Sequence, residues 1–156
     1  MGSILVQVAD PEWTMQAVHL ACAMARNTHS PLVLLHLMEV RNPYLLGAEI
    51  GVMPPSRSQL EAIGEYSMIA EDYGLELTVR PMSFISLADA LVQAAEHTHA
   101  SVVFAPVPQS RLPFWRKLHL LNLRRQLTAQ GCQLYTLDEP EQTEDWVPTV
   151  SMKAAK

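Results

Sequence analysis

Leu32-Val33-Leu34-Leu35-His36-Leu37-Met38 is the stretch that decides the fold. Its apolar side chains occupy both sets of alternate positions, so neither face of a strand formed here could lie in water. A strand that is apolar on both faces is typical of a parallel sheet with helices on each side. We therefore expect this run to be a buried parallel strand, with His36 as a histidine of the core.

The segments around this run alternate between short apolar strands and amphipathic helices. Residues 4–9 form an apolar run that ends at Asp10, an N-cap type, and Pro11, which suits the first turn of a helix. Ser58 and Glu61 have the spacing of a capping box for a second helix. Further strands are expected at 76–82, 101–105 and 133–137, and further helices after Ser86 and at 117–130.

This alternation predicts an α/β protein with an open five-stranded parallel sheet and helices on both of its faces. The 156 residues are enough for one domain with a hydrophobic core, which we place at residues 1–137. Residues 138–156 are polar and begin with several acidic side chains. We expect them to form a flexible, acidic C-terminal tail.

Several classes of protein do not fit this sequence. No apolar run approaches the ~20 residues that cross a bilayer, and the N-terminus lacks the basic region and cleavage site of a signal peptide. Cys22 and Cys132 fall in expected regular elements, where reduced core thiols are typical of a cytoplasmic protein. We find no metal-binding motif and no nucleophile–base pair, so we expect no metal site and no enzyme.

Four segments carry a family resemblance through their order and spacing. They are Ile4-Leu5-Val6-Gln7-Val8, Ala17-Val18-His19-Leu20-Ala21-Cys22-Ala23-Met24-Ala25, Leu34-Leu35-His36-Leu37-Met38-Glu39, and Ala90-Leu91-Val92-Gln93-Ala94-Ala95-Glu96 with Ala100-Ser101-Val102-Val103-Phe104. In this order the chain resembles the universal stress protein family over about residues 3–137. The resemblance implies a Rossmann-like sheet of the adenine nucleotide alpha hydrolase type and a homodimer, often formed by pairing of the last strand.

Some members of that family bind ATP through glycines that are missing from this chain. Their motif has two glycines three apart after the fourth strand, then a third about ten residues on, followed by Ser or Thr. The corresponding positions here hold Ala105, Pro108 and Leu118, followed by His119. The aspartate of the family's first strand falls on Ala9, and Asp10 comes one residue late.

The turn Ala105-Pro106-Val107-Pro108 is poorly suited to hold a phosphate with its backbone. Proline has no N–H group, fixes φ near −65° and biases the residue before it toward extended geometry. A cradle of successive N–H groups needs a tight bend with left-handed backbone, which glycine tolerates. Losing two donors to a charged group lowers affinity by on the order of 10²–10⁴. We therefore expect no ATP cofactor held by this turn.

A degenerate ligand cleft is still expected where the carboxyl ends of the strands meet the helices. Its candidate residues are Asp10, Met38, Ala105, Pro106, Pro108, Arg111, Lys117 and His119. Asp10 could cap the first helix or contact a ribose, and we favour the cap. Arg111, Lys117 and His119 are the side chains that could hold a phosphate in place of the glycine loop.

The charge of the chain is divided unevenly. Residues 98–137 contain no Asp or Glu, although the whole chain has a net charge of −5. The basic segment, residues 111–125, could be a solvated face, a partner or dimer surface, or an attachment site for an anionic membrane or nucleic acid. Net acidity opposes the last of these, so we expect no nucleic acid partner. The candidate partner surface comprises Phe114, Trp115, Arg116, Leu121, Arg124 and Arg125.

The sequence thus predicts a non-catalytic regulatory or interaction protein that forms a homodimer and does not bind ATP through a glycine loop. The alternative is a nucleotide-responsive stress protein that binds ATP or another phosphate ligand through Arg111, Lys117 or His119.

Overall fold

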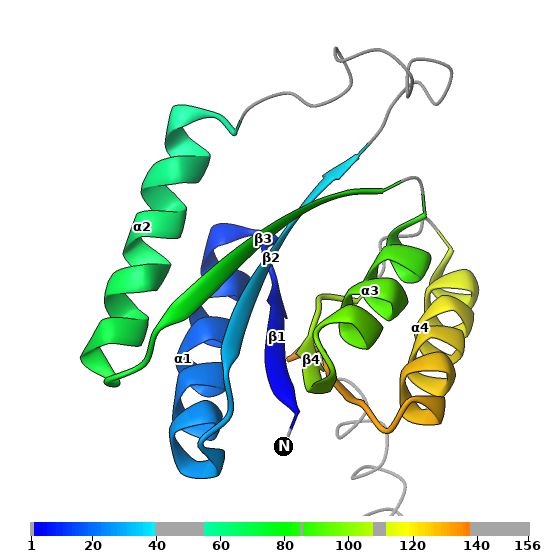
Figure 1. Ribbon diagram of the computed structural model, residues 1–156. Coiled ribbons are helices and arrows are strands. Elements are labelled where there is room, and N and C mark those ends of the chain that lie inside the picture. The colour runs from blue at the N-terminus through cyan, green and yellow to red at the C-terminus, as the bar shows by residue number, and fades with distance from the viewer. Residues whose placement is uncertain (1, 40–54, 85, 108–111, 138–156) are drawn as a thin grey trace, which may run out of the picture.

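The computed structural model describes residues 2–39, 55–84, 86–107 and 112–137 (Figure 1). In chain order the elements are β1 (Ser3–Gln7), α1 (Pro11–Thr28), β2 (Leu32–Glu39), α2 (Arg57–Asp72), β3 (Leu77–Phe84), α3 (Leu87–His97), β4 (Ala100–Phe104), α4 (Pro113–Ala129) and β5 (Gln133–Tyr135). The expected alternation of strands and helices is confirmed. The division between a domain at 1–137 and a tail at 138–156 stays a prediction, since the tail lies outside the described residues.

The five strands form one parallel sheet in the order β3-β2-β1-β4-β5. β1 is the central strand. β2 and β3 follow it on one side, and the chain then crosses to the other side of β1 to form β4 and β5. The carboxyl ends of β1 and β4 therefore form the topological switch point, where open α/β sheets most often bind ligands.

Two layers of helices cover the sheet, with α1 and α2 on one face and α3 and α4 on the other (Figure 1). Alternate residues of β1 supply both cores. Ile4 and Val6 pack with α1 and α2, whereas Leu5 packs with α3 and α4. The open five-stranded parallel sheet with helices on both faces, predicted from the sequence, is thus confirmed.

The apolar run at residues 32–38 lies in β2, which is buried on both faces, as predicted. Leu32 and Leu34 belong to the core beneath α1 and α2, and Val33 and Leu35 to the core beneath α3 and α4. His36 is buried as well. The strand pairs with β1 on one side and with β3 on the other, which encloses it within the sheet.

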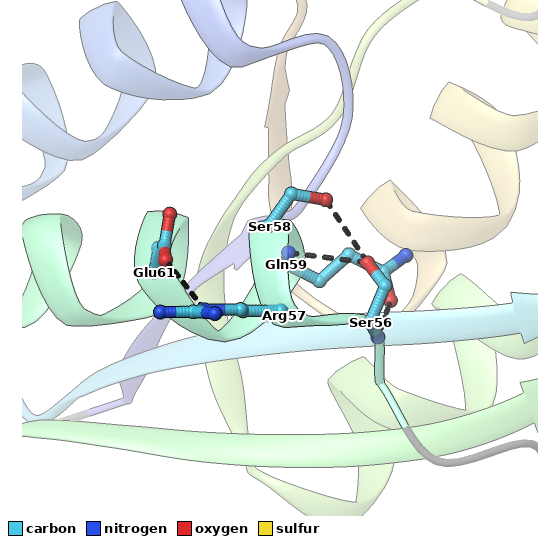
Figure 2. Close-up of polar contacts among 5 residues, drawn as sticks. All are labelled: Ser56, Arg57, Ser58, Gln59 and Glu61. Atoms are coloured by element: carbon cyan, nitrogen blue, oxygen red, sulfur yellow. Dashed lines mark hydrogen bonds and ion pairs between the residues drawn. The ribbon is translucent and has the colours of Figure 1, made fainter.

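The second helix begins at a different capping box from the one predicted. Ser56 and Gln59 form the box: the Gln59 N–H donates to Ser56 Oγ (3.3 Å), and the Ser56 N–H donates to Gln59 Oε1 (2.8 Å; Figure 2). The prediction of Ser58 and Glu61 was wrong, because both residues already lie inside α2. Glu61 instead pairs with Arg57 one turn away, at 3.3 Å.

Other boundaries also differ from the predicted ones, by one or two residues for β3 (Leu77–Phe84) and β4 (Ala100–Phe104). The fourth helix begins at Pro113 and not at residue 117, since proline is pre-organised for the first position of a helix. The last strand ends at Tyr135 and not at residue 137, because Leu137 has a left-handed backbone (φ 65°) that interrupts the extended chain.

Candidate functional site

A cavity of about 720 Å³ opens at the switch point, where β1 and β4 end. On the β1 side it is lined by Gln7, the last residue of that strand, and by Asp10 and Trp13 at the start of α1. Asp10 caps α1, because its carboxylate accepts the Trp13 N–H at 3.4 Å. The predicted capping role of Asp10 is therefore confirmed.

The indole of Trp13 is a fixed part of the cavity wall. Its Nε1–H donates to the Thr136 carbonyl oxygen at 2.8 Å, in a buried hydrogen bond between the start of α1 and the chain after β5. Trp13 itself is buried. Because the Nε1–H is the only polar group of the indole and is already hydrogen-bonded, the ring presents an apolar surface to the cavity.

The helices on the other face of the sheet complete the cavity. The first turn of α3 contributes Leu87 and Ala88, with Leu91 deeper along the same helix. Leu123 of α4 lies opposite, in the same buried cluster as Leu91. The lining is therefore mainly apolar, which is usual for a small-molecule site.

The structure brings together only part of the predicted ligand cleft. Asp10, Pro106 and His119 line the cavity. Three other candidates do not: Met38 is half-buried at the end of β2, Ala105 is completely buried, and Lys117 is exposed on α4. Pro108 and Arg111 lie outside the described residues. The ligand-binding role of all these residues stays a prediction.

Two backbone donors at the strand ends beside the cavity are occupied. The Ala105 N–H donates to the Tyr135 carbonyl oxygen (3.1 Å), and the Ala9 N–H donates to Thr14 Oγ1 (2.9 Å). Pro106 has no N–H to offer. Around these two strand ends the chain therefore offers little of the cradle of free amides that grips a phosphate.

Gln7 is the cavity residue that sequence reasoning missed most clearly. It is 6% exposed, and its Oε1 has no hydrogen-bond partner in the part of the chain that the structure describes. In the sequence, Gln7 is only one position of a strand-like run. The available signal was its position, because Gln7 is a polar residue on the same strand face as Leu5 and directly follows the apolar residues 4–6.

The outer face of α4 is apolar and exposed. Phe114, Leu118 and Leu121 are exposed to 70%, 44% and 57%, although Leu120 and Leu123 of the same helix are buried. One apolar stripe of α4 therefore packs on the sheet, and another faces outward.

Aromatic and basic side chains extend this exposed stripe. The Trp115 ring contacts Phe114 edge to face (5.9 Å between centroids) and also lies against His119 (6.2 Å). Arg116 and Arg125 are exposed and Arg124 is half-buried. All six residues of the predicted partner surface thus lie on α4, but their role stays a prediction.

Neither cysteine offers a reactive thiol. Cys22 and Cys132 are buried and free, and burial raises the pKa of each to about 11. Their predicted place in the core is confirmed. Among the described residues no group of three His, Cys, Asp or Glu side chains could hold a metal ion.

Comparisons with known proteins connect this fold to solved structures. No protein-family model matches the sequence. No curated protein matches it either. A universal stress protein in complex with cAMP is similar in structure, with a TM-score of 0.59 and 16% sequence identity over 86% of this chain and 95% of that chain.

Two further structures show the same likeness. A protein of the universal stress protein family from Burkholderia pseudomallei has a TM-score of 0.57 and 16% identity, over 86% of this chain and 94% of that one. A universal stress protein from Archaeoglobus fulgidus in complex with dAMP has a TM-score of 0.53 and 12% identity, over 87% and 97%. The chain therefore has the fold of universal stress proteins, as its sequence resemblance predicts. No helix within the described residues is long and apolar enough to cross a membrane.

Proposed function

We propose that this chain is a divergent universal stress protein that acts through protein contacts. In this proposal it is a non-catalytic regulatory or interaction protein of the cytoplasm, and it forms a homodimer. Its free, buried thiols suit a reducing compartment. It does not hold ATP through the turn after β4, where a proline stands beside occupied backbone donors.

The observation that carries this proposal is the second apolar face of α4. Phe114, Leu118 and Leu121 lie on the side of the helix away from the sheet, where water would cover them in a monomer. A helix that is apolar on two sides normally has two neighbours. Clustered exposed apolar residues mark contact surfaces, and aromatic and Arg side chains are typical anchors of such surfaces.

A second copy of the chain is the partner that this face fits best. Helix α4 packs beside β5, which is one of the two edge strands of the sheet. Edge strands carry unpaired backbone groups, and a two-fold axis beside β5 would pair them while bringing the two α4 helices together. The same arrangement is implied by the resemblance to universal stress proteins.

A charge placed on this face tests the proposal. Leu121→Glu puts a carboxylate within the exposed stripe, so sedimentation should show that the dimer dissociates more readily, with Kd raised by about tenfold or more. Gln126→Glu adds the same charge on an exposed position of α4 away from the stripe and should leave the dimer intact. If the wild-type chain sediments as a monomer at all concentrations, or if both variants behave alike, the proposal is wrong.

His119 supports the alternative function. It lines the cavity from α4, and two of the similar structures hold cAMP and dAMP. In this alternative, Arg111, Lys117 and His119 would bind the phosphate of a nucleotide through their side chains. Denaturing the purified protein and analysing the extract for nucleotide tests this reading. Nucleotide that co-purifies with the wild type, and is lost in Arg111→Ala, would favour the alternative over the first proposal.

A further inference from the structure

Gln7 gives the cavity a polar group that the fold does not use. The residue is more than nine-tenths buried, and its Oε1 accepts no hydrogen bond within the described residues. A buried acceptor without a donor costs stability, because it has lost water and gained nothing in return. Such a residue is expected where a ligand supplies the missing donor.

The side chain of Gln7 lies on the side of the sheet that the cavity occupies. Side chains alternate along a strand, so Gln7 shares the face of Leu5, which packs with α3 and α4. Leu91 of α3 and Leu123 of α4 line the same cavity on that face. In the present rotamer Oε1 is covered, but the terminal amide torsion of glutamine is soft, so a rotation can present the oxygen to a ligand.

The charge of the described walls disfavours anions. The Asp10 carboxylate lines the cavity, whereas no Lys or Arg among the described residues does so. The nearby amides of Ala9 and Ala105 already donate within the protein. A phosphate would therefore meet a carboxylate and occupied amides at these two strand ends, although His119 and the first turn of α3, which has no side-chain cap, stand at its sides.

We propose that the cavity binds an uncharged, largely apolar small molecule whose N–H or O–H group donates to Gln7 Oε1. The apolar walls supply most of the affinity through burial, and Gln7 selects ligands that carry a donor. This inference goes beyond the proposed function and does not depend on the α4 face, since the cavity and the exposed stripe of α4 are formed by different side chains.

A pair of matched probes tests the inference. Indole carries one N–H, and indene has nearly the same shape but no such donor. Chemical shifts of the Trp13 indole N–H, followed by NMR during titration, report binding inside the cavity. We expect indole to bind about tenfold more tightly than indene, because only indole can satisfy the buried acceptor.

Two variants make the result specific. Gln7→Leu removes the acceptor at nearly constant volume, so indole and indene should bind it equally well. Because this change also removes an unpaired buried group, the melting temperature of the free protein should not fall. Ala88→Phe fills part of the cavity from a half-buried lining position on α3 and should weaken both probes about tenfold or more.

Several results would overturn the inference. Equal binding of indole and indene to the wild type would show that Gln7 selects nothing. Failure of indole to shift the Trp13 resonance at millimolar concentration, or displacement of bound indole by micromolar ATP, would refute an uncharged ligand. None of these results bears on the dimer, so failure here and failure of the proposed function are distinguishable.

Discussion

Asp10 shows how one residue can suggest two functions. Its carboxylate lines the cavity, but it also accepts the Trp13 N–H as the N-cap of α1. Negative charge at the start of a helix is favourable in its own right, because the helix dipole is positive there. The sequence could predict the cap because Asp followed by proline is a start signal. It could place a cleft at this end of the sheet, but it could not predict the walls that α3 and α4 contribute, because these form only when the two helices pack over the sheet.

Asp10→Ala should destabilise the protein by about 0.5–1 kcal/mol, the lower part of the range for a lost N-cap, because the hydrogen bond is long. Asp10→Asn keeps an acceptor and should cost less. Urea denaturation followed by circular dichroism measures both. Equal stability of all three proteins would mean that the carboxylate does not serve as a cap.

The elements were predicted well where their pattern is continuous and poorly where two signals overlap. The apolar run of β2 allows only a buried strand, and that prediction was right. At α2, Ser56 with Gln59 and Ser58 with Glu61 both have capping-box spacing, and the sequence alone does not say which forms. The structure selects the first pair, because the helix begins at Arg57.

Helix α4 begins without a side-chain N-cap. Its N-cap is Leu112, which makes no side-chain cap hydrogen bond and is exposed. Leu112→Asp supplies an acceptor for the first turn and a charge that suits the helix dipole, so it should stabilise the protein by about 1 kcal/mol. Leu112→Ala is the matched control in the same denaturation experiment. An aspartate variant no more stable than the alanine variant would contradict this account of the helix start.

At the scale of the whole molecule, the sheet topology builds the cavity. Gln7, Ala88 and His119 are far apart in the sequence, and the strand order brings them to one end of the sheet. The sequence located that end, because Pro106 and His119 were predicted for it. It missed Gln7 and the start of α3, because no local pattern says which helix packs over which strand end.

The reactivity of Cys22 and Cys132 measures how readily the two hydrophobic cores open. Burial raises the pKa of Cys22 and Cys132 to about 11, so at pH 8 their thiolate fraction is on the order of 10² below that of an exposed cysteine. We expect labelling by a thiol reagent to be slow in the folded protein, to accelerate as the pH rises toward 11, and to be complete in urea. Rapid labelling at pH 8 without denaturant would show that the two cores open more readily than described.

Calorimetric titration of the purified protein with ATP and Mg²⁺ tests the central claim most directly. The claim is that this stress protein fold has kept its switch point but lost the backbone grip on phosphate. We predict no measurable heat of binding with ATP in the micromolar range, for the wild type and for Lys117→Ala alike. A micromolar Kd that persists when Arg111, Lys117 and His119 are all replaced by alanine would contradict the claim, since the turn after β4 would then hold a triphosphate despite its prolines. A micromolar Kd that is lost in that variant would favour the side-chain alternative.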